Sequence, residues 1–349
     1  MAGDSIPTSE GSRSSTRWIR QLFANGFHIN DTTVDYPAFP RFCLKVYNWG
    51  DRTFNSYDTA YVAGTGRNWK IQGKSFNWLE NYAFIFPKHN EVMLRSNVYA
   101  DIGGYLSFMA VSVGYMFNAN ELVNDRFDTR SHFNFNFTCA LFNIDYLETS
   151  TKGGAVIQRM GSYENGRHIS IPFENVSNST KSLQATYFFG HRRYSHAAAY
   201  CFSKYQLKSA GSWMAGVYYL NQNVSLDFNG LPQDMAQQIP TDKRLFRFHY
   251  TDYTLTGGYG HNWALKPRKW LLNLTFLQGL GYKHTKEDNT DGRRNMIALN
   301  PMVTGSLVYN HRALFVALQG RFNGRFYFNG AYTFFNSLST AQLTVGARF

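Results

Sequence analysis

The residue types that could support nucleophilic catalysis gather in one stretch near the middle of the chain. Ser195 is followed directly by His196, with His191 nearby, and Ser209 and Ser212 come shortly afterwards. A serine hydroxyl activated by a histidine attacks carbonyl carbon atoms, which is the chemistry of lipid hydrolases and proteases. These serines occur in turn-like sequence, where hydroxyl groups usually bond the backbone, and no known nucleophile motif surrounds them. We therefore predict that the protein is not an enzyme and keep a lipid hydrolase as an alternative.

Metal-ligating residue types are present, but their spacing does not suit a shared ion. His249, Asp252 and His261 fall in one segment with the pattern of a strand. An extended strand rises about 3.3 Å per residue, so the two histidines would lie about 40 Å apart. The chain also has three cysteines, which are widely separated: Cys43, Cys139 and Cys201. They show neither a metal-ligand spacing nor a disulfide framework. We predict no metal and no cofactor.

A set of basic and amide residues near the C-terminus could instead bind anions. The set comprises Arg321, Asn323, Arg325, Gln342 and Arg348. Its members alternate with apolar residues such as Leu318 and Phe322, so neighbouring β-strands would place the set on one face. Positive charge on the inner face of a barrel would give an anion-preferring pore or a site for an acidic ligand. The other interpretation is that the arginines pair with carboxylates such as Asp101 and Asp145 and fill the interior.

The composition indicates which elements must carry these residues. Hydrophobic residues make up 44% of the chain and aromatic residues 17%, while charged residues are also 17%, below the roughly 25% of average globular chains. Mean hydropathy is nevertheless negative at -0.37, and no apolar run approaches the roughly 18 residues of a membrane helix. Alternating lipid-facing and lumen-facing residues produce this combination in a membrane β-barrel.

The last nine residues show the alternation most clearly. Ala341, Leu343 and Val345 alternate with Gln342 and Thr344, and the chain stops on an aromatic residue. Terminal residues usually fray unless they are tied into a sheet. In a closed barrel the last strand pairs with the first, which removes both sheet edges. The sequence therefore predicts a closing strand at the C-terminus.

Stretches of the same period recur along the chain and predict an all-β, transmembrane antiparallel barrel of about twelve strands, an even number as in bacterial single-chain barrels. Four cover residues 69–75, 91–108, 109–118 and 132–146; eight more begin near residues 181, 194, 212, 245, 269, 296, 312 and 340. Residues 148–180 fit this pattern least. Barrels of this size enclose much less space than the 16–18 strands of open porins. We therefore favour a largely filled interior over an open channel.

The chain before the first barrel strand has a different character. Residues 1–14 are polar and predict a disordered leader, and residues 15–68 predict an irregular N-terminal periplasmic segment with a short helix within 16–27. Residues 69–349 form the predicted barrel. The first twenty residues contain no apolar region typical of a secretory signal, which argues against export from this start.

The net charge of +12 comes from 35 lysines and arginines against 23 aspartates and glutamates. Such a balance can indicate nucleic-acid binding. Here the basic residues are scattered and no nucleic-acid-binding motif is present, so we predict no nucleic-acid partner. Basic residues also suit barrel rims that face anionic lipid headgroups.

Three stretches together resemble a known family. They are Tyr-Asp-Thr-Ala-Tyr-Val at residues 57–62, Gln-Leu-Lys-Ser-Ala-Gly-Ser at residues 206–212, and the terminal strand. From about residue 56 to Phe349 the chain resembles uncharacterised outer-membrane proteins common in Bacteroidota. The resemblance implies a β-barrel in the bacterial outer membrane with a domain of unknown function, and it supplies no catalytic residue. It also implies that the barrel-assembly machinery would recognise the C-terminal strand.

These observations favour an outer-membrane barrel with a structural or binding role and a largely filled lumen. Its expected partners are outer-membrane lipid and lipopolysaccharide, together with a protein of the cell envelope. A narrow anion-preferring channel and an outer-membrane lipid hydrolase are the alternatives.

Overall fold

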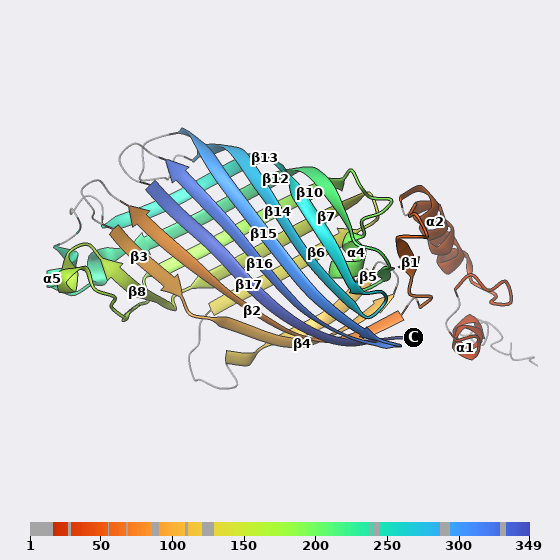
Figure 1. Ribbon diagram of the computed structural model, residues 1–349. Coiled ribbons are helices and arrows are strands. Elements are labelled where there is room, and N and C mark those ends of the chain that lie inside the picture. The colour runs from red at the N-terminus through yellow and green to blue at the C-terminus, as the bar shows by residue number, and fades with distance from the viewer. Residues whose placement is uncertain are drawn as a thin grey trace, which may run out of the picture.

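The computed structural model describes residues 17–26, 29–54, 56–67, 69–85, 91–108, 111–120, 129–237, 239, 244–286, 294–328 and 333–349. The predicted leader, residues 1–14, lies outside this set. Most of the described chain forms one large antiparallel sheet that curls around an enclosed space, here called the lumen (Figure 1). The predicted all-β barrel architecture is therefore confirmed.

The sheet has fifteen strands among the described residues. They are β2 (Trp69–Ile85), β3 (Glu91–Ser96), β4 (Tyr99–Phe108), β5 (Val111–Asn118), β6 (Thr129–Thr138), β7 (Phe142–Lys152), β8 (Ala155–Met160), β9 (Ile171–Phe173), β10 (Val176–Phe188), β12 (Ala210–Asp227), β13 (Leu245–Lys266), β14 (Trp270–Thr285), β15 (Asn295–His311), β16 (Leu314–Phe328) and β17 (Thr333–Arg348). A separate two-stranded sheet pairs β1 (Val62–Gly64) with β11 (Lys204–Gln206).

The C-terminal strand, β17, pairs with β2, the first strand of the large sheet. β17 pairs with β2 from Thr333 opposite Ile85 to Arg348 opposite Lys70. The neighbours of β2 beyond this ladder are β4 along its first part and β3 along its last part. Because β3, β8 and β9 form a side branch on β2, twelve of the fifteen strands surround the lumen in the described chain. The predicted pairing of residues 341–349 with the first barrel strand is therefore present, but it does not remove both sheet edges, because β5 and β6 do not pair with each other among the described residues.

The number of strands around the lumen agrees with the prediction, but three of the predicted strands differ. Residues 91–108 contain both β3 and β4, and this leaves the total unchanged because β3 lies in the side branch. Residues 132–146 belong to two strands, β6 and β7, because the phase slip near Cys139 is a turn between them. The strand predicted near Tyr194 is wrong, since this segment contains the short helix α4 (His196–Tyr200). The last two differences cancel in the total. Periodicity alone could not separate three alternating residues of a strand from one turn of a buried helix.

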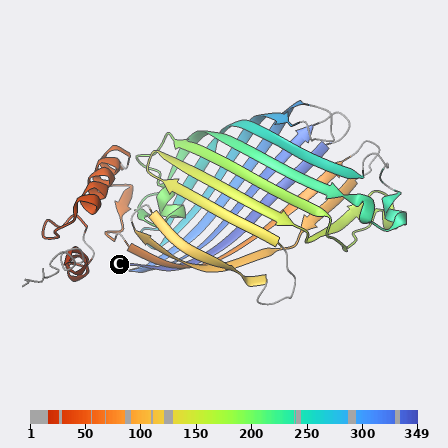
Figure 2. The ribbon, with the colours of Figure 1, turned by 180° about the vertical axis from the view of Figure 1, so that it is seen from behind.

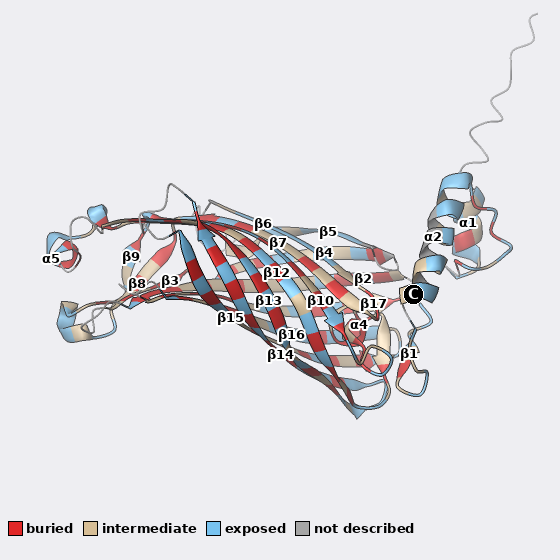
Figure 3. Ribbon diagram, turned by 90° about the horizontal axis from the view of Figure 1, so that it is seen from above, coloured by how far each residue is buried: buried red, intermediate tan, exposed pale blue. Residues whose placement is uncertain are grey.

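The outer face of the sheet is apolar. Leu255 in the middle of β13 is 72% exposed, and Trp213 near the start of β12 is 69% exposed. Burial alternates with exposure along the strands, as the banded colouring in Figure 3 shows. Exposed apolar patches of this extent are unusual on soluble monomers. The side chains that the sequence places outside, such as Leu318, Phe322 and Leu343, are indeed exposed.

The two ends of the barrel differ in their connections. At the end that carries the C-terminus, called the short-turn end, β13 joins β14 and β15 joins β16 through only a few residues. Arg268 and Arg312 adopt positive φ angles of 60° and 52° in these turns. The opposite end, called the long-connection end, carries the segments between β7 and β10 and between β12 and β13, with α5 (Gln233–Ala236) in the second (Figure 1).

Two helices precede the barrel and lie beyond its short-turn end (Figures 1 and 2). They are α1 (Arg17–Ala24) and α2 (Ala38–Phe54). α2 differs from the irregular segment predicted there, because Pro40 falls in its first turn, where a missing N–H costs little. Its end is tied to the turn between β6 and β7: the Ala140 N–H donates to the Phe54 carbonyl at 3.1 Å, and the Phe54 and Phe142 rings lie 5.9 Å apart. Among the described residues, no helix is both long enough and apolar enough to cross a membrane.

Candidate functional site

The connection between β10 and β12 folds back into the short-turn end of the lumen (Figure 2). We call this connection, residues 189–209, the plug; it contains α4. The Ser195 hydroxyl caps α4 by accepting a hydrogen bond from the Ala198 N–H at 3.2 Å. Three consecutive alanines, 197–199, are buried because their small side chains let the helix approach the wall. The Ala199 carbonyl accepts a hydrogen bond from the Ser306 hydroxyl of β15 at 2.7 Å.

Side chains from the barrel wall fix the plug through its backbone carbonyls. Lys70 Nζ donates to the Cys201 carbonyl at 2.6 Å, and Arg348 Nε donates to the Phe202 carbonyl at 2.7 Å. Asn262 Nδ2 donates to the Ser195 carbonyl at 2.9 Å. Cationic donors form stronger hydrogen bonds than neutral ones. The plug is therefore a fixed part of the lumen and not a loose loop.

Arg348 points inward, as the alternation predicted, and its surroundings define its role. The side chain is 1% exposed, and its Nη2 donates to Asn310 Oδ1 at 2.7 Å. Its guanidinium lies 4.4 Å from the centre of the Phe315 ring. Together with its bond to Phe202, these contacts make Arg348 an anchor of the plug and not a residue that lines a pore.

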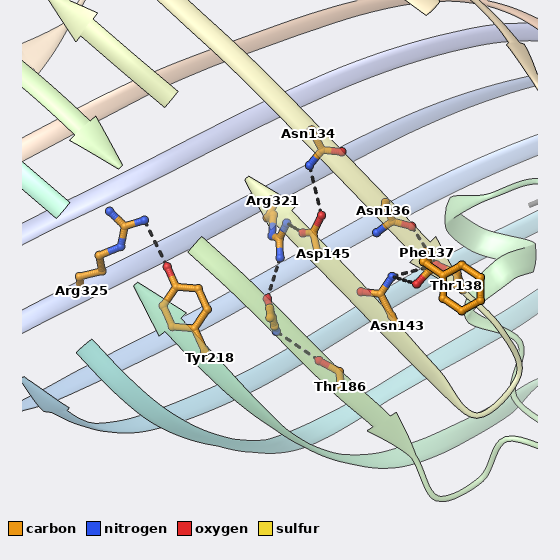
Figure 4. Close-up of polar contacts among 11 residues, drawn as sticks. Asn134, Asn136, Phe137, Thr138, Asn143, Asp145, Thr186, Tyr218, Arg321 and Arg325 are labelled. Atoms are coloured by element: carbon orange, nitrogen blue, oxygen red, sulfur yellow. Dashed lines mark hydrogen bonds and ion pairs between the residues drawn. The ribbon is translucent and has the colours of Figure 1, made fainter. Parts of the chain in front are cut away.

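Arg321 forms the predicted ion pair with a lumenal carboxylate. Its Nη1 contacts Asp145, and its Nη2 donates to Gln184 Oε1 at 2.8 Å. Asn134 Nδ2 donates to Asp145 Oδ1 at 3.1 Å, so three strands meet at this carboxylate (Figure 4). The second predicted carboxylate, Asp101, is paired with Arg130 and not with an arginine of the predicted set.

Arg325 belongs to a layer of polar and aromatic side chains that crosses the lumen further from the plug. Its Nη1 donates to Asn336 Oδ1 at 2.8 Å. Its Nη2 donates to the Tyr218 hydroxyl at 3.4 Å (Figure 4). In the same layer Lys283 Nζ lies 3.1 Å from the centre of the Tyr327 ring, which fits a cation–π contact.

Apolar side chains fill the lumen beyond this layer, towards the long-connection end. The Phe84 and Phe334 ring centres are 4.7 Å apart, and those of Phe248 and Phe334 are 5.0 Å apart. These rings belong to one buried hydrophobic cluster that also contains Leu220 and Val224. The interior of this half is packed like the core of a soluble protein.

The last two residues of the predicted set also face inward. Gln342 Nε2 donates to Gln319 Oε1 at 2.8 Å and to the Thr344 hydroxyl at 2.9 Å. Asn323 is 5% exposed, and its Oδ1 has no hydrogen-bond partner among the described residues. A buried amide oxygen without a partner loses the hydrogen bonds that water would have given it.

A cavity of about 1280 Å³ lies between the plug and the filled half of the lumen. It is lined by residues of β2, β4, β5, β6, β16 and β17 as well as by α4. Its lining contains two carboxylates, Asp101 and Asp145, and six lysines and arginines: Arg67, Lys70, Lys74, Arg130, Lys204 and Arg321. Both carboxylates are already paired with arginines. Lys70 and Lys74 form no ion pair among the described residues, so the cavity carries an excess of positive charge.

Sequence reasoning placed the inward-facing set on the last two strands and missed the lysines on β2. The signal was present, because Lys70, Gln72 and Lys74 alternate with Ile71 and Gly73. The predicted pairing of the last strand with the first already implied that this strand lies beside the predicted set, and the β17–β2 ladder shows it.

The serines and histidines considered for catalysis have other partners. Ser212 Oγ accepts from the Gly190 N–H at 2.9 Å and donates to the Trp213 carbonyl at 2.7 Å, while Ser209 Oγ accepts from the Ala264 N–H at 3.0 Å. His196 stacks on Tyr200 with ring centres 4.4 Å apart. Burial lowers the pKa of His196 to about 3, with the positive charge of Arg321 as a second cause. The described residues hold no group of three or more histidine, cysteine or acidic residues suited to a metal ion.

Structural comparison finds similarity to outer-membrane proteins. The outer-membrane protease OmpT of Escherichia coli is 10% identical, with a TM-score of 0.39; the alignment covers 82% of this chain and 98% of that one. The toluene transporter TodX of P. putida is 6% identical, with a TM-score of 0.26; the alignment covers 86% of this chain and 97% of that one. The translocator domain of the autotransporter NalP of Neisseria meningitidis is 6% identical, with a TM-score of 0.27; the alignment covers 89% of this chain and 96% of that one.

Sequence comparison gives a family but no characterised relative. No curated protein matches the chain. One family, described as a domain of unknown function, DUF4421, matches residues 56–349. This range begins where the sequence resemblance begins and takes in β1, the whole barrel and its plug. The chain thus belongs to the DUF4421 family of domains of unknown function.

Proposed function

We propose that the protein is a barrel of the bacterial outer membrane that binds a component of the cell envelope inside its lumen and neither conducts solutes nor catalyses a reaction. The observation that carries this proposal is the arrangement along the lumen. The plug closes the short-turn end, the layer around Arg325 and the aromatic cluster fill the other half, and the cavity lies between them. A compartment with charged walls that ends against a filled half of the lumen suits binding better than passage through the barrel.

The exposed apolar face of the sheet supports the membrane location. A band of outward-facing Leu, Val and aromatic side chains is favourable in contact with lipid hydrocarbon and unfavourable in contact with water. By the asymmetry of bacterial barrels, the short-turn end faces the periplasm. The N-terminal helices then lie on the periplasmic side, and lipid, lipopolysaccharide and the assembly machinery are the expected partners. A Bacteroidota source is part of the same expectation.

Planar-bilayer recording tests the proposal. The purified protein, folded into bilayers and verified by heat-modifiable migration on gels, is expected to give a trace without single-channel steps. Steady anion-selective steps would contradict the filled lumen and support a narrow anion channel. This channel is the second candidate function, because Lys70 and Lys74 form no ion pair among the described residues. Recovery of the protein in the soluble fraction instead of the outer-membrane fraction would contradict the location.

A further inference from the structure

The sheet does not close between β5 and β6. Among the described residues, β5 pairs only with β4 and β6 pairs only with β7. We call the boundary between these two strands the seam. In a bilayer an open sheet edge is tolerated only where its peptide groups line a polar or water-filled cavity, because hydrocarbon cannot bond them. The cavity described above meets this condition, since its lining includes both β5 and β6.

Among the described residues, side-chain contacts hold the seam at the end where β6 begins. Arg130, near the start of β6, donates through Nη2 to Asp101 Oδ1 at 2.7 Å and to the Ala100 carbonyl at 3.0 Å on β4. The His132 ring lies 4.9 Å from the Phe76 ring of β2. The rest of the seam lies nearer the short-turn end. There Ser112 to Met116 on β5 and Asn134 to Thr138 on β6 line the cavity.

Aromatic side chains stand on both sides of this opening. Tyr115 and Phe117 of β5 are 68% and 61% exposed, and Phe133 and Phe135 of β6 are 57% and 53% exposed. All four also line the cavity. The cavity is therefore basic and polar at its inner wall and aromatic at its side opening. An anionic amphiphile matches this arrangement, with its charged head at the inner wall and its apolar chain at the opening.

Polar atoms without partners mark where a head group would lie. Arg321 Nε and Asn323 Oδ1 are buried, lack hydrogen-bond partners among the described residues, and belong to residues that line the cavity. The first is a donor and the second an acceptor. Both atoms are covered by neighbouring atoms, so a ligand reaches them only when the two side chains turn towards the cavity. A phosphate monoester that carries one proton would then offer anionic oxygens to the first and a hydroxyl to the second. Lys70 and Lys74 supply charge that no carboxylate of the described residues neutralises.

We infer that the cavity binds an amphiphile with a phosphate monoester head group, which enters from the membrane through the β5–β6 seam. This inference rests on the proposed function and adds the ligand class and the route. The volume of about 1280 Å³ exceeds the roughly 300–1,000 Å³ of ordinary ligand pockets. The head and the first part of a chain fit within it, and the remaining chain lies in the bilayer between the aromatic side chains.

Binding of short probes tests the ligand class. Protein folded in dodecyl maltoside is titrated with dodecyl phosphate, with dodecylphosphocholine, or with inorganic phosphate, and the bound probe is counted by native mass spectrometry. We expect dodecyl phosphate to be retained at least about tenfold more tightly than the other two, because only it offers both the charge and the chain. Equal retention of inorganic phosphate would show a free-anion site, and equal retention of dodecylphosphocholine would show unselective detergent binding; either result would overturn the inference.

Matched variants assign the binding to the cavity. Lys74→Gln removes a cavity charge and is expected to weaken dodecyl phosphate binding about tenfold, because charge-assisted bonds to the head are lost. Lys74→Arg should restore it. The control, Lys266→Gln, makes the same charge change on an exposed residue at the short-turn end outside the cavity lining, and should leave binding unchanged. Heat-modifiable migration verifies that each variant is folded. Equal effects of the two glutamine variants would contradict a cavity site.

A photoreactive probe tests the route. Dodecyl phosphate with a diazirine in its chain should form adducts on β5 and β6 that disappear with excess unlabelled dodecyl phosphate. Adducts spread over the outer faces of strands such as β13 and β14, and insensitive to competition, would overturn lateral entry. Failure of all these binding tests together with a silent bilayer trace would reject the ligand class but leave the non-conducting barrel intact.

Discussion

At the scale of single residues, the inward-facing arginines stabilise the lumen by different contacts. Arg321 neutralises a buried carboxylate, Arg325 bonds amide and phenol groups, and Arg348 holds backbone carbonyl and amide oxygens. A buried guanidinium is tolerated only when its donors find acceptors, because its desolvation is costly. The expectation that arginines fill the interior by pairing with carboxylates holds for Arg321. Arg325 and Arg348 form no salt bridge among the described residues and are held by hydrogen bonds to uncharged groups instead.

Arg348→Ala is predicted to destabilise the folded protein by about 2–4 kcal/mol, because it leaves the Phe202 carbonyl and Asn310 Oδ1 buried without their donor. Urea unfolding in lipid vesicles measures the change in the free energy of unfolding. Lys269→Ala removes an exposed charge from the same end of the barrel and should change it by less than about 0.5 kcal/mol. An equal loss for both variants would show that Arg348 does not anchor the plug.

At the scale of elements, α4 is the part of the fold that periodicity misassigned. Ala198, Tyr200 and Phe202 continue the alternation of a strand, yet the chain turns inward after Gly190. The Ser195 cap and the small buried side chains of Ala197 and Ala199 favour one helical turn against the wall. Such a turn satisfies its backbone through wall residues such as Ser306, which lie more than a hundred positions away in the sequence. The side chains of the plug therefore have an interior and not a surface environment.

This environment predicts a pH dependence of stability. The pKa of His196 falls from 6.5 to about 3 on folding, because burial disfavours the charged ring. Between these values the unfolded chain binds a proton that the folded protein does not, so stability is full above pH 6.5 and falls as the pH drops towards 3. Between pH 8 and pH 5 the loss from this group is about 2 kcal/mol.

Urea unfolding of the wild type and of His196→Gln at both pH values measures this loss. The variant should lack this part of the pH dependence, whatever its stability at pH 8. The matched variant His311→Gln changes an exposed histidine at the short-turn end and should keep the wild-type dependence. An identical pH dependence in the wild type and His196→Gln would contradict a buried, neutral ring in the plug.

At the scale of the whole molecule, the distribution of apolar groups is inverted relative to a soluble barrel. Leu and aromatic side chains cover the outside of the sheet, while lysines, arginines and amides share the inside with an aromatic cluster. A bilayer makes this arrangement favourable, because the outer side chains meet hydrocarbon and the inner polar groups meet one another. The proposed membrane location therefore has a direct energetic test.

Leu255→Arg is predicted to destabilise the protein in lipid vesicles by about 2–4 kcal/mol, because a charge would face the hydrocarbon near the middle of β13. Leu265→Arg makes the same change on the same face near the end of that strand, where the cost should be about 0–1 kcal/mol. Comparison of the two unfolding free energies measures the depth dependence. Two small and equal effects would indicate that this face meets water.

The sequence by itself determined the parts of this protein that depend on local alternation. The strand at residues 341–349 and the inward direction of Arg321 and Arg348 follow from a period of two, whereas the total of about twelve barrel strands agrees because two errors cancel. The family boundary near residue 56 was also visible in sequence, because the first of the stretches that carry the resemblance begins at residue 57. A strand with one apolar face has a single stable orientation once that face is assigned to the outside.

Only the tertiary structure decided what the inner face encloses. The helical turn of α4 and the open seam between β5 and β6 both depend on which strands become neighbours. Local sequence carries no information about these partners, because the relevant residues lie up to several hundred positions apart and meet only when the sheet closes. The same strand alternation is compatible with an open channel and with a filled lumen, and the side chains of the plug and the aromatic cluster decide between them.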